Sequence, residues 1–278
     1  MKITFLGTAA SEGVPAMFCS CKYCQNIRKS GVKEYRTRTQ VLIDDNMSID
    51  FPPEAYSHSL NFGVNLSALK YLLVTHSHMD HFYAHDFVLR GYKYGVLEEN
   101  LLSIFGNEEV AKVYDECTRR ELKPEVAVHV NLKVIKPYQI FEAGDYRVIA
   151  LPAMHGTKED ALLYYVERGG KGYLHLYDTG DFSDEAIDFL ANNNAKADAV
   201  AFDCTFLDAP YERGRRHMCI EGDMLLAQRL ERAGVINKKT VKIITHFSHN
   251  ANPVKERVEK VERQYGVIAA YDGLSIEI

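Results

Sequence analysis

Hydrophobic residues along this chain fall mostly into short runs bounded by turn residues, with longer amphipathic segments between some of them. Short apolar or alternating runs predict strands, and apolar positions at helical spacing predict helices. The predicted strands lie at residues 3–6, 39–43, 47–51, 69–74, 102–105, 126–130, 132–135, 147–151, 164–168, 173–177, 199–202, 241–245, 267–270 and 274–278. The predicted helices lie at residues 25–30, 82–94, 108–122, 184–192, 220–233 and 253–265. Groups of strands and helices alternate twice, which predicts mixed α and β structure.

Turn residues divide the chain without breaking it into domains. Gly169, Gly170 and Gly172 separate two predicted strands and indicate a β-hairpin. No Pro/Ser-rich linker, low-complexity segment or change in composition interrupts the sequence. We therefore expect one domain over residues 1–278.

Composition and charge narrow the class of protein. The chain has 278 residues, of which 46% are hydrophobic and 26% charged, as in ordinary globular proteins. Its net charge of −5 argues against a dedicated nucleic-acid binder. No apolar run approaches the roughly 18 residues that span a membrane, and residues 1–6 lack the features of a signal peptide. We expect a cytoplasmic protein without a membrane partner.

The densest group of candidate metal ligands directly follows the predicted strand 69–74. This group comprises His76, His78, Asp80 and His81. Imidazole and carboxylate side chains bind Zn²⁺, Mn²⁺ and Fe²⁺. At a strand end His76 and His78 share a face, while Asp80 and His81 fall in the following turn. The spacing suggests two adjacent metal ions rather than a histidine-rich surface loop.

Three later residues could complete such a site, because each follows a predicted strand. They are His155, Asp178 and His246. Taken singly, the two histidines could equally be core residues. Asp178 could cap a strand, and Asp160 or Asp181 could take its place.

A second cluster of candidate ligands lies near the N-terminus. Cys19, Cys21 and Cys24 have the spacing C-x-C-x-x-C, which supplies three of the four ligands of a structural zinc ion. The alternatives are a redox-active C-x-x-C pair or buried thiols. A redox pair does not need the first cysteine, so zinc is favoured.

The order H-x-H-x-D-H after an apolar strand, with the three later positions, resembles the metallo-β-lactamase superfamily. This resemblance implies an αββα sandwich, in which two mixed β-sheets are flanked by helices. It also implies two divalent metal ions (Zn, Mn or Fe) with a bridging hydroxide. One ion would be held by His76, His78 and His155, the other by Asp80, His81 and His246, and Asp178 would bridge them. Asp50 would brace the metal loop.

Two further features each resemble a branch of that superfamily. The cysteine cluster combined with H-x-x-H resembles the branch that contains a phosphoribosyl cyclic phosphodiesterase and a pyrroloquinoline-quinone biosynthesis protein, which implies His249 as the fourth ligand of the structural zinc. The block D-x-T-F with a following H-M resembles the phosphodiesterase and tRNA-processing branch, which implies that His217 protonates the leaving group or holds a phosphate oxygen. The respective alternatives are that His249 is exposed or contacts His246, and that His217 is a histidine in a surface loop.

These features predict a dinuclear metal-dependent phosphodiesterase, with Asp80, Asp178 and His217 as its catalytic residues. Its partner would be a small, possibly cyclic phosphodiester, and the resemblance suggests a homodimer. Three alternatives stay open: an enzyme that acts on a non-phosphodiester substrate by hydrolysis or oxygenation, a tRNA 3′-end nuclease, and a non-catalytic zinc protein. Whether Arg213, Arg215 or Arg216 contacts phosphate is also open.

Overall fold

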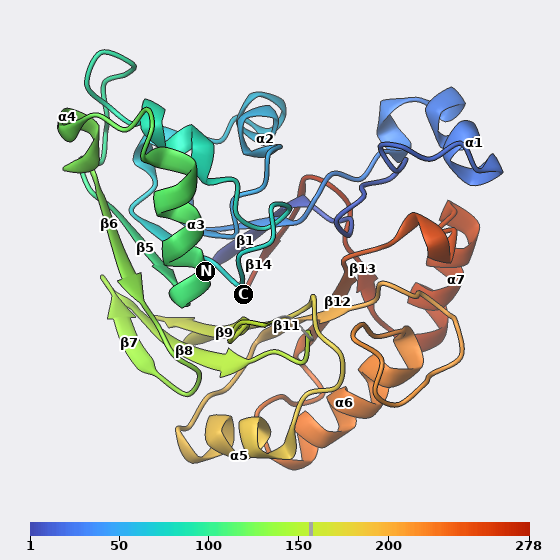
Figure 1. Ribbon diagram of the computed structural model, residues 1–278. Coiled ribbons are helices and arrows are strands. Elements are labelled where there is room, and N and C mark those ends of the chain that lie inside the picture. The colour runs from blue at the N-terminus through green and yellow to red at the C-terminus, as the bar shows by residue number, and fades with distance from the viewer. Residues whose placement is uncertain (156–157) are drawn as a thin grey trace.

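Two seven-stranded sheets form the centre of the molecule in a computed structural model, which describes residues 1–155 and 158–278 (Figure 1). In the first sheet the order is β14 (Leu274–Glu277), β1 (Lys2–Gly7), β2 (Gln40–Ile43), β3 (Met47–Ile49), β4 (Tyr71–Leu73), β5 (Leu102–Gly106) and β6 (Val130–Val134). In the second it is β13 (Ile268–Ala269), β12 (Val241–Thr245), β11 (Ala199–Asp203), β10 (Lys171–Leu176), β9 (Leu162–Arg168), β8 (Tyr146–Pro152) and β7 (Ile140–Ala143).

Both sheets are mixed. Strands β3 to β6 are parallel in the first sheet, and β10 to β13 are parallel in the second. The last strand, β14, pairs antiparallel with β1, so the two chain ends lie side by side in one sheet (Figure 1). The carboxyl ends of parallel strands meet at one edge, which is where α/β proteins commonly place ligand sites.

Side-chain alternation divides the core into layers. On β9, Leu162, Tyr164 and Val166 pack between the two sheets, whereas Leu163 and Tyr165 face the helices outside the second sheet. This is the period of two expected for a strand that is buried on both faces.

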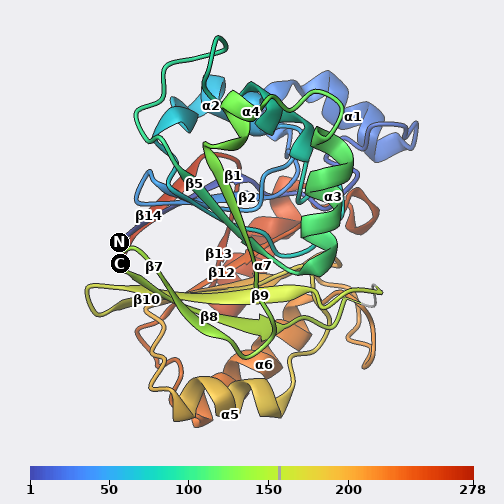
Figure 2. The same cartoon turned by 60° about the vertical axis from the view of Figure 1, so that its left-hand side comes forward.

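Helices cover the outer faces of both sheets (Figures 1 and 2). The α-helices are α1 (Lys22–Ser30), α2 (Ala55–Phe62), α3 (Glu108–Thr118), α4 (Pro124–Ala127), α5 (Asp184–Asn192), α6 (Ile220–Arg232) and α7 (Lys255–Tyr265). The short 3₁₀ helices are η1 (Val32–Glu34), η2 (Leu66–Ala68), η3 (Ala84–Leu89) and η4 (His249–Ala251). The arrangement confirms the predicted αββα sandwich.

The predicted hairpin is also confirmed. Strands β9 and β10 pair antiparallel, with Arg168 opposite Lys171. Gly169 and Gly170 both have positive φ, 58° and 75°. Two consecutive residues of this kind give the turn that matches the twist of the flanking strands.

Two predictions of secondary structure were wrong, and one strand was not predicted. The helix over residues 82–94 is only the single 3₁₀ segment η3, because Phe82 instead forms an extended bridge to Phe51. The strand over 126–130 begins as α4, whose first residue is Pro124, a residue well suited to a helix N-terminus. Strand β7 was missed because only one of its four residues is buried, so its pattern is weak.

No helix among the described residues is long and apolar enough to cross a membrane. The cytoplasmic location, the extent of the domain and the homodimer stay predictions.

Candidate metal centre

The turn after β4 gathers the first group of predicted ligands. His78 accepts hydrogen bonds at its carbonyl oxygen from the backbone N–H groups of His81 and Phe82 (2.9 and 2.8 Å). This tight turn keeps His76 and His81 buried while His78 is exposed. His76 Nε2 lies 2.9 Å from His78 Nδ1. The local fold therefore places both histidines of the H-x-H pair at one point.

His155 joins this pair from the loop after β8. Its Nε2 lies 3.3 Å from His78 Nδ1, and its ring centroid is 4.6 Å from that of His76. The three histidines can present ligand atoms that all lie within 4.8 Å of one another. The structure thus brings together the set predicted for one metal ion.

Asp178 occupies the centre of the cluster. Its Oδ2 lies 2.8 Å from His81 Nε2, 3.3 Å from His76 Nε2 and 3.9 Å from His246 Nε2. Its Oδ1 lies 3.0 Å from His155 Nδ1. One buried carboxylate therefore faces four histidines from three segments of the chain, as a bridging ligand would.

The second predicted set is less compact than the first. Asp80 Oδ2 lies 3.2 Å from His81 Nε2. His246 groups instead with Asp178, Asp203 and His217. The structure thus places His246 on the side of Asp178 that faces His217, and the division of ligands between two ions stays a prediction.

The donor atoms fit divalent cations. His81 Nε2, His155 Nδ1, His246 Nε2 and Asp178 Oδ1 are all buried and make no hydrogen bond among the described residues. Buried polar atoms without partners are costly unless something else satisfies them. Because these atoms belong to convergent imidazoles and a carboxylate, a divalent metal ion suits them chemically.

Electrostatics favour an ionised carboxylate here. Burial alone would raise the pKa of Asp178, but His246, His155 and His81 hold it well below its usual range. Burial lowers the pKa of His76 well below its usual value. A neutral imidazole beside a carboxylate is the protonation state in which both can bind a metal.

Hydrogen bonds that Asp50 accepts support the metal loop, as the resemblance implies. Asp50 Oδ2 lies 2.6 Å from His81 Nδ1. Its Oδ1 accepts hydrogen bonds from the N–H and hydroxyl of Thr75 (2.8 and 2.9 Å). This arrangement leaves Nε2 of His81 facing Asp178 and the cluster.

Glu159 supports the same loop and was missed in the sequence. It accepts hydrogen bonds from the N–H and hydroxyl of Ser77 (3.1 and 2.7 Å) and from the side-chain amide of Asn107 (2.7 Å). These partners lie far apart along the chain, and no spacing rule connects them. Only the tertiary structure reveals this contact.

His217 lies beside the predicted ligands, and its Nδ1 contacts Asp203 Oδ2 at 3.0 Å. Burial alone would lower the pKa of His217, but the carboxylate of Asp203 raises it to about 9. The rings of His217 and His246 are stacked, with their centroids 5.5 Å apart. A partly exposed histidine with a raised pKa therefore faces the cluster.

Two threonines and a carboxylate fix this side of the centre. Thr205 Oγ1 lies 2.8 Å from His246 Nδ1. Asp203 accepts hydrogen bonds from the backbone N–H groups of Thr179 and Met218 (3.2 and 3.1 Å). Asp203 thus joins Thr179, which follows Asp178, to Met218, which follows His217.

The three predicted arginines differ in their surroundings. Arg215 forms an ion pair with Glu212 and lies over the Phe206 ring at 5.1 Å. Arg213 and Arg216 are exposed next to it. Arg215 is therefore already engaged by protein groups.

The cysteine cluster assembles with His249. The ligand atoms of these four residues lie within 4.8 Å of one another. His249 Nδ1 is 3.5 Å from Cys24 Sγ and 4.0 Å from Cys21 Sγ. A hydrogen bond from the Cys24 N–H, followed in strength by the His249 contact, lowers the pKa of Cys21 to about 6. Thiolates with imidazole suit a structural zinc ion.

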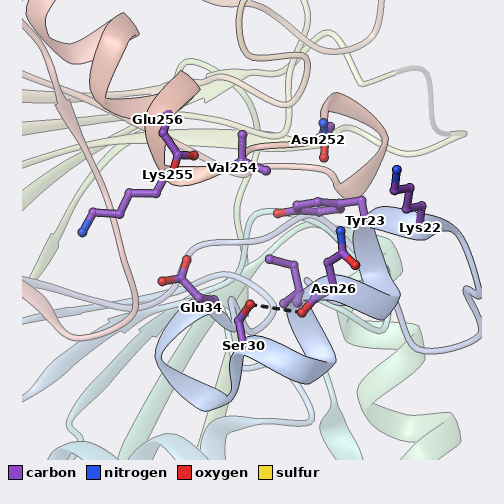
Figure 3. A pocket seen from close by; sticks show the side chains of 10 residues that line it. Lys22, Tyr23, Asn26, Ser30, Glu34, Asn252, Val254, Lys255 and Glu256 are labelled. Carbon is purple, nitrogen blue, oxygen red and sulfur yellow. Dashed lines mark hydrogen bonds between the residues drawn. The ribbon is translucent and has the colours of Figure 1, made fainter.

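Two cavities lie apart from these clusters. One, of about 560 Å³, separates α1 from the start of α7, and Tyr23, Glu34 and Lys255 are among its lining residues (Figure 3). The other, of about 610 Å³, is lined mainly by apolar residues that include Phe51 and Phe87. Among the described lining residues of either cavity there is no predicted metal ligand.

One similar protein among the curated sequences is about twice as long as this chain. A curated octanoyltransferase from Porphyromonas gingivalis is 26% identical over 286 residues, which cover 99% of this chain and 51% of that protein. The chain thus spans about half the length of this relative.

Two solved structures share the whole architecture. A new diphosphatase of the PhnP family has a TM-score of 0.70 at 22% identity, with 100% of this chain and 97% of that chain covered. Zn²⁺-bound PqqB from Methylobacterium extorquens has a TM-score of 0.72 at 18% identity, with both chains covered completely (100%). Residues 40–247 match the β-lactamase superfamily domain. With this match and its αββα fold, the chain belongs to the metallo-β-lactamase superfamily.

Proposed function

We propose that this protein is a dinuclear metal-dependent phosphodiesterase that hydrolyses a small, possibly cyclic phosphodiester. The observation that carries the proposal is the position of His217, which lies beside the ligand cluster and is held by Asp203 at 3.0 Å. Phosphodiester hydrolysis needs a proton donor because an alkoxide is a poor leaving group. His217 has the charge and position to act as that donor.

The chain's own residues would divide the work. The metal ligands would be His76, His78, Asp80, His81, His155, Asp178 and His246. Two divalent cations bound there would activate water and offset the charge on the phosphoryl oxygens. Asp178 would keep its negative charge between them, because neighbouring histidines hold its pKa well below its usual range.

The proton path follows from the hydrogen bonds of His217. Its Nδ1 faces Asp203, so Nε2 is the nitrogen that would serve the substrate. The attacking water forms a bond to phosphorus and releases one proton to solvent, the bond to the leaving oxygen breaks, and Nε2 passes its proton to that oxygen. His217 then regains a proton from solvent, which closes the proton balance. Asp203 then stabilises the protonation state to which His217 returns.

The structural zinc would be held by Cys19, Cys21, Cys24 and His249. We propose that this ion is mechanical rather than catalytic, because it would join the loop after β1 to the segment that follows His246. The diphosphatase name of one structural neighbour favours a phosphorus centre as the substrate. Octanoyl transfer, the activity named for the curated relative, has no support in this ligand cluster, and half of that relative lies outside the match.

The test is activity profiling of protein loaded separately with Zn²⁺, Mn²⁺ or Fe²⁺. Cyclic and linear phosphodiesters, bis(p-nitrophenyl) phosphate and a tRNA precursor form the panel. We expect turnover of small diesters and little cleavage of the tRNA precursor. Inactivity on every diester with both metal positions filled would instead favour a non-phosphodiester substrate, as in the quinone-pathway relative.

Replacement of His217 separates its role from metal binding. We expect His217→Ala to lose roughly 10²- to 10⁴-fold in rate, with unchanged metal content by mass spectrometry. His85→Ala, at an exposed histidine of η3, is the matched control and should keep its activity. Full activity of His217→Ala would remove this residue from the proposed mechanism.

A further inference from the structure

Glu12 lies between the two proposed metal sites, in the loop after β1. Its backbone carbonyl accepts a hydrogen bond from the N–H of Met17 (3.1 Å), which shapes the approach to the cysteine cluster. Its carboxylate accepts a hydrogen bond from Ser248 Oγ at 2.5 Å. Glu12 therefore joins the cysteine loop directly to the segment between His246 and His249.

The same carboxylate faces the predicted zinc ligand. Glu12 Oε1 is 3.9 Å from His249 Nε2, while His249 Nδ1 is the nitrogen that faces Cys21 and Cys24. An imidazole that binds a metal through Nδ1 carries its proton on Nε2. At 3.9 Å the carboxylate lies beyond hydrogen-bond distance, so it acts on this ring as a nearby negative charge that favours a proton on Nε2.

Ser248 extends the connection to the other cluster. Its N–H donates to the backbone carbonyl of Thr205 (3.3 Å), and Thr205 Oγ1 contacts His246 Nδ1 at 2.8 Å. The path from Glu12 through Ser248 and Thr205 therefore ends on a predicted ligand of the active centre.

Backbone contacts also hold this region, because the N–H of Ala10 donates to the carbonyl of Phe247 (3.1 Å) and the N–H of Phe247 donates to the carbonyl of Thr8 (2.9 Å). The cavity of about 560 Å³ separates α1 from the start of α7. Figure 3 shows the ring of Tyr23 close to Val254 across this space, and the Tyr23 hydroxyl donates to the carbonyl of Pro253 at 3.4 Å. Glu12 adds a side-chain contact to the backbone contacts between the loop after β1 and the segment after β12.

We propose that Glu12 is a positioning residue that couples the cysteine–histidine site to the active centre. Its negative charge lies beside the Nε2 edge of His249, and its hydrogen bond holds Ser248, whose N–H contacts Thr205. This inference rests on the structural zinc proposed above. Glu12 itself belongs to neither set of predicted metal ligands.

The test compares Glu12→Gln, which removes the negative charge and keeps the shape, with Glu12→Asp and with Glu34→Gln. Glu34 is an exposed glutamate of η1 and serves as the control. The first readout is zinc transfer to a colorimetric chelator. The second is the thiolate-to-metal absorption band of Co²⁺-substituted protein.

We expect Glu12→Gln to hold zinc at the cysteine site about 10- to 100-fold less tightly, with a shifted Co²⁺ band. Glu12→Asp should recover part of the affinity, and Glu34→Gln should match the wild type. A wild-type-like release rate and spectrum in Glu12→Gln would overturn the role of Glu12 alone. If Cys24→Ser loses no metal relative to the wild type, the structural zinc and the role of Glu12 both fail. The proposed phosphodiesterase function does not depend on that result, because the panel of diesters tests it.

Discussion

At the scale of single residues, buried carboxylates decide how the histidines of this site behave. Asp203 faces His217, Asp50 faces His81, and Asp178 faces the ligand nitrogens. Burial alone would lower the pKa of each histidine, and a nearby carboxylate opposes that effect. The carboxylate partner therefore sets which imidazole donates a proton and which donates a lone pair.

Replacement of Asp203 should change the titration of His217. In metal-free protein the pKa of His217 is raised to about 9 by Asp203, against the lowering effect of burial. We expect Asp203→Asn to lower this pKa by about one unit or more, measured by NMR of the imidazole nitrogens. An unchanged titration would mean that another group controls His217.

The same pair predicts a pH dependence of stability. A histidine whose pKa is higher in the folded state stabilises fully below its unfolded pKa of about 6.5. That stabilisation is lost as the pH rises through about 9. The stability advantage of metal-free wild type over Asp203→Asn should therefore be greatest below pH 6.5 or so and should shrink in alkali, as urea unfolding can measure.

Asp50 offers a test of support without direct ligation. Because it fixes His81 through Nδ1 at 2.6 Å, we expect Asp50→Ala to weaken active-centre metal binding by about 10- to 100-fold. Competition with a chelator measures this affinity. The cysteine site of the same variant serves as the internal control and should keep its metal.

At the scale of elements, strand ends carry the site in an unusual backbone conformation. Asp50 after β3, Asp178 after β10 and His246 after β12 all have positive φ, between 58° and 63°. Such angles are uncommon for residues other than glycine and cost energy. Their occurrence at three site residues indicates that the surrounding hydrogen bonds hold the turns in place.

Gly180 allows the segment that follows Asp178 to meet the loop that carries His217. A Cβ at this position would lie 2.1 Å from the carbonyl oxygen of Arg215, which belongs to the His217 loop. Gly180→Ala should therefore displace that loop and lower the free energy of unfolding by about 1–3 kcal/mol. The fractional loss of catalytic rate should exceed the fractional loss of folded protein. Gly95→Ala, where a Cβ meets nothing within 4 Å, is the matched control.

At the scale of the whole molecule, the two sheets bring distant segments to one edge. Residues from β4, β8, β10 and β12 or from the loops that follow them meet around Asp178. The cysteine cluster lies on a separate part of the fold, formed by α1 and η4. The molecule therefore separates a candidate catalytic centre from a structural one.

Metal content should reflect that separation. We expect about three metal ions per chain when all sites are filled, two at the active centre and one at the cysteine site, because the two sites share no ligand. Cys24→Ser should lose one ion and keep the other two, while Asp178→Ala should lose metal from the active centre alone. Loss of all metal in Cys24→Ser would contradict independent sites.

The sequence by itself determined the strand order along the chain, the metal motif and most candidate ligands. These features depend on local periodicity and on short spacings such as that from His76 to His81, which are visible without a fold. It failed where tertiary contacts override local preference, as at Phe82, which pairs with Phe51 instead of starting a helix.

Only the tertiary structure decided which atoms meet. The support of Ser77 by Glu159 and the link from Glu12 to Ser248 join residues 82 and 236 positions apart in the chain. Such contacts depend on how two sheets pack and on side-chain directions, neither of which is encoded in a local pattern. The central place of Asp178 likewise exists only once four strand ends reach the same edge.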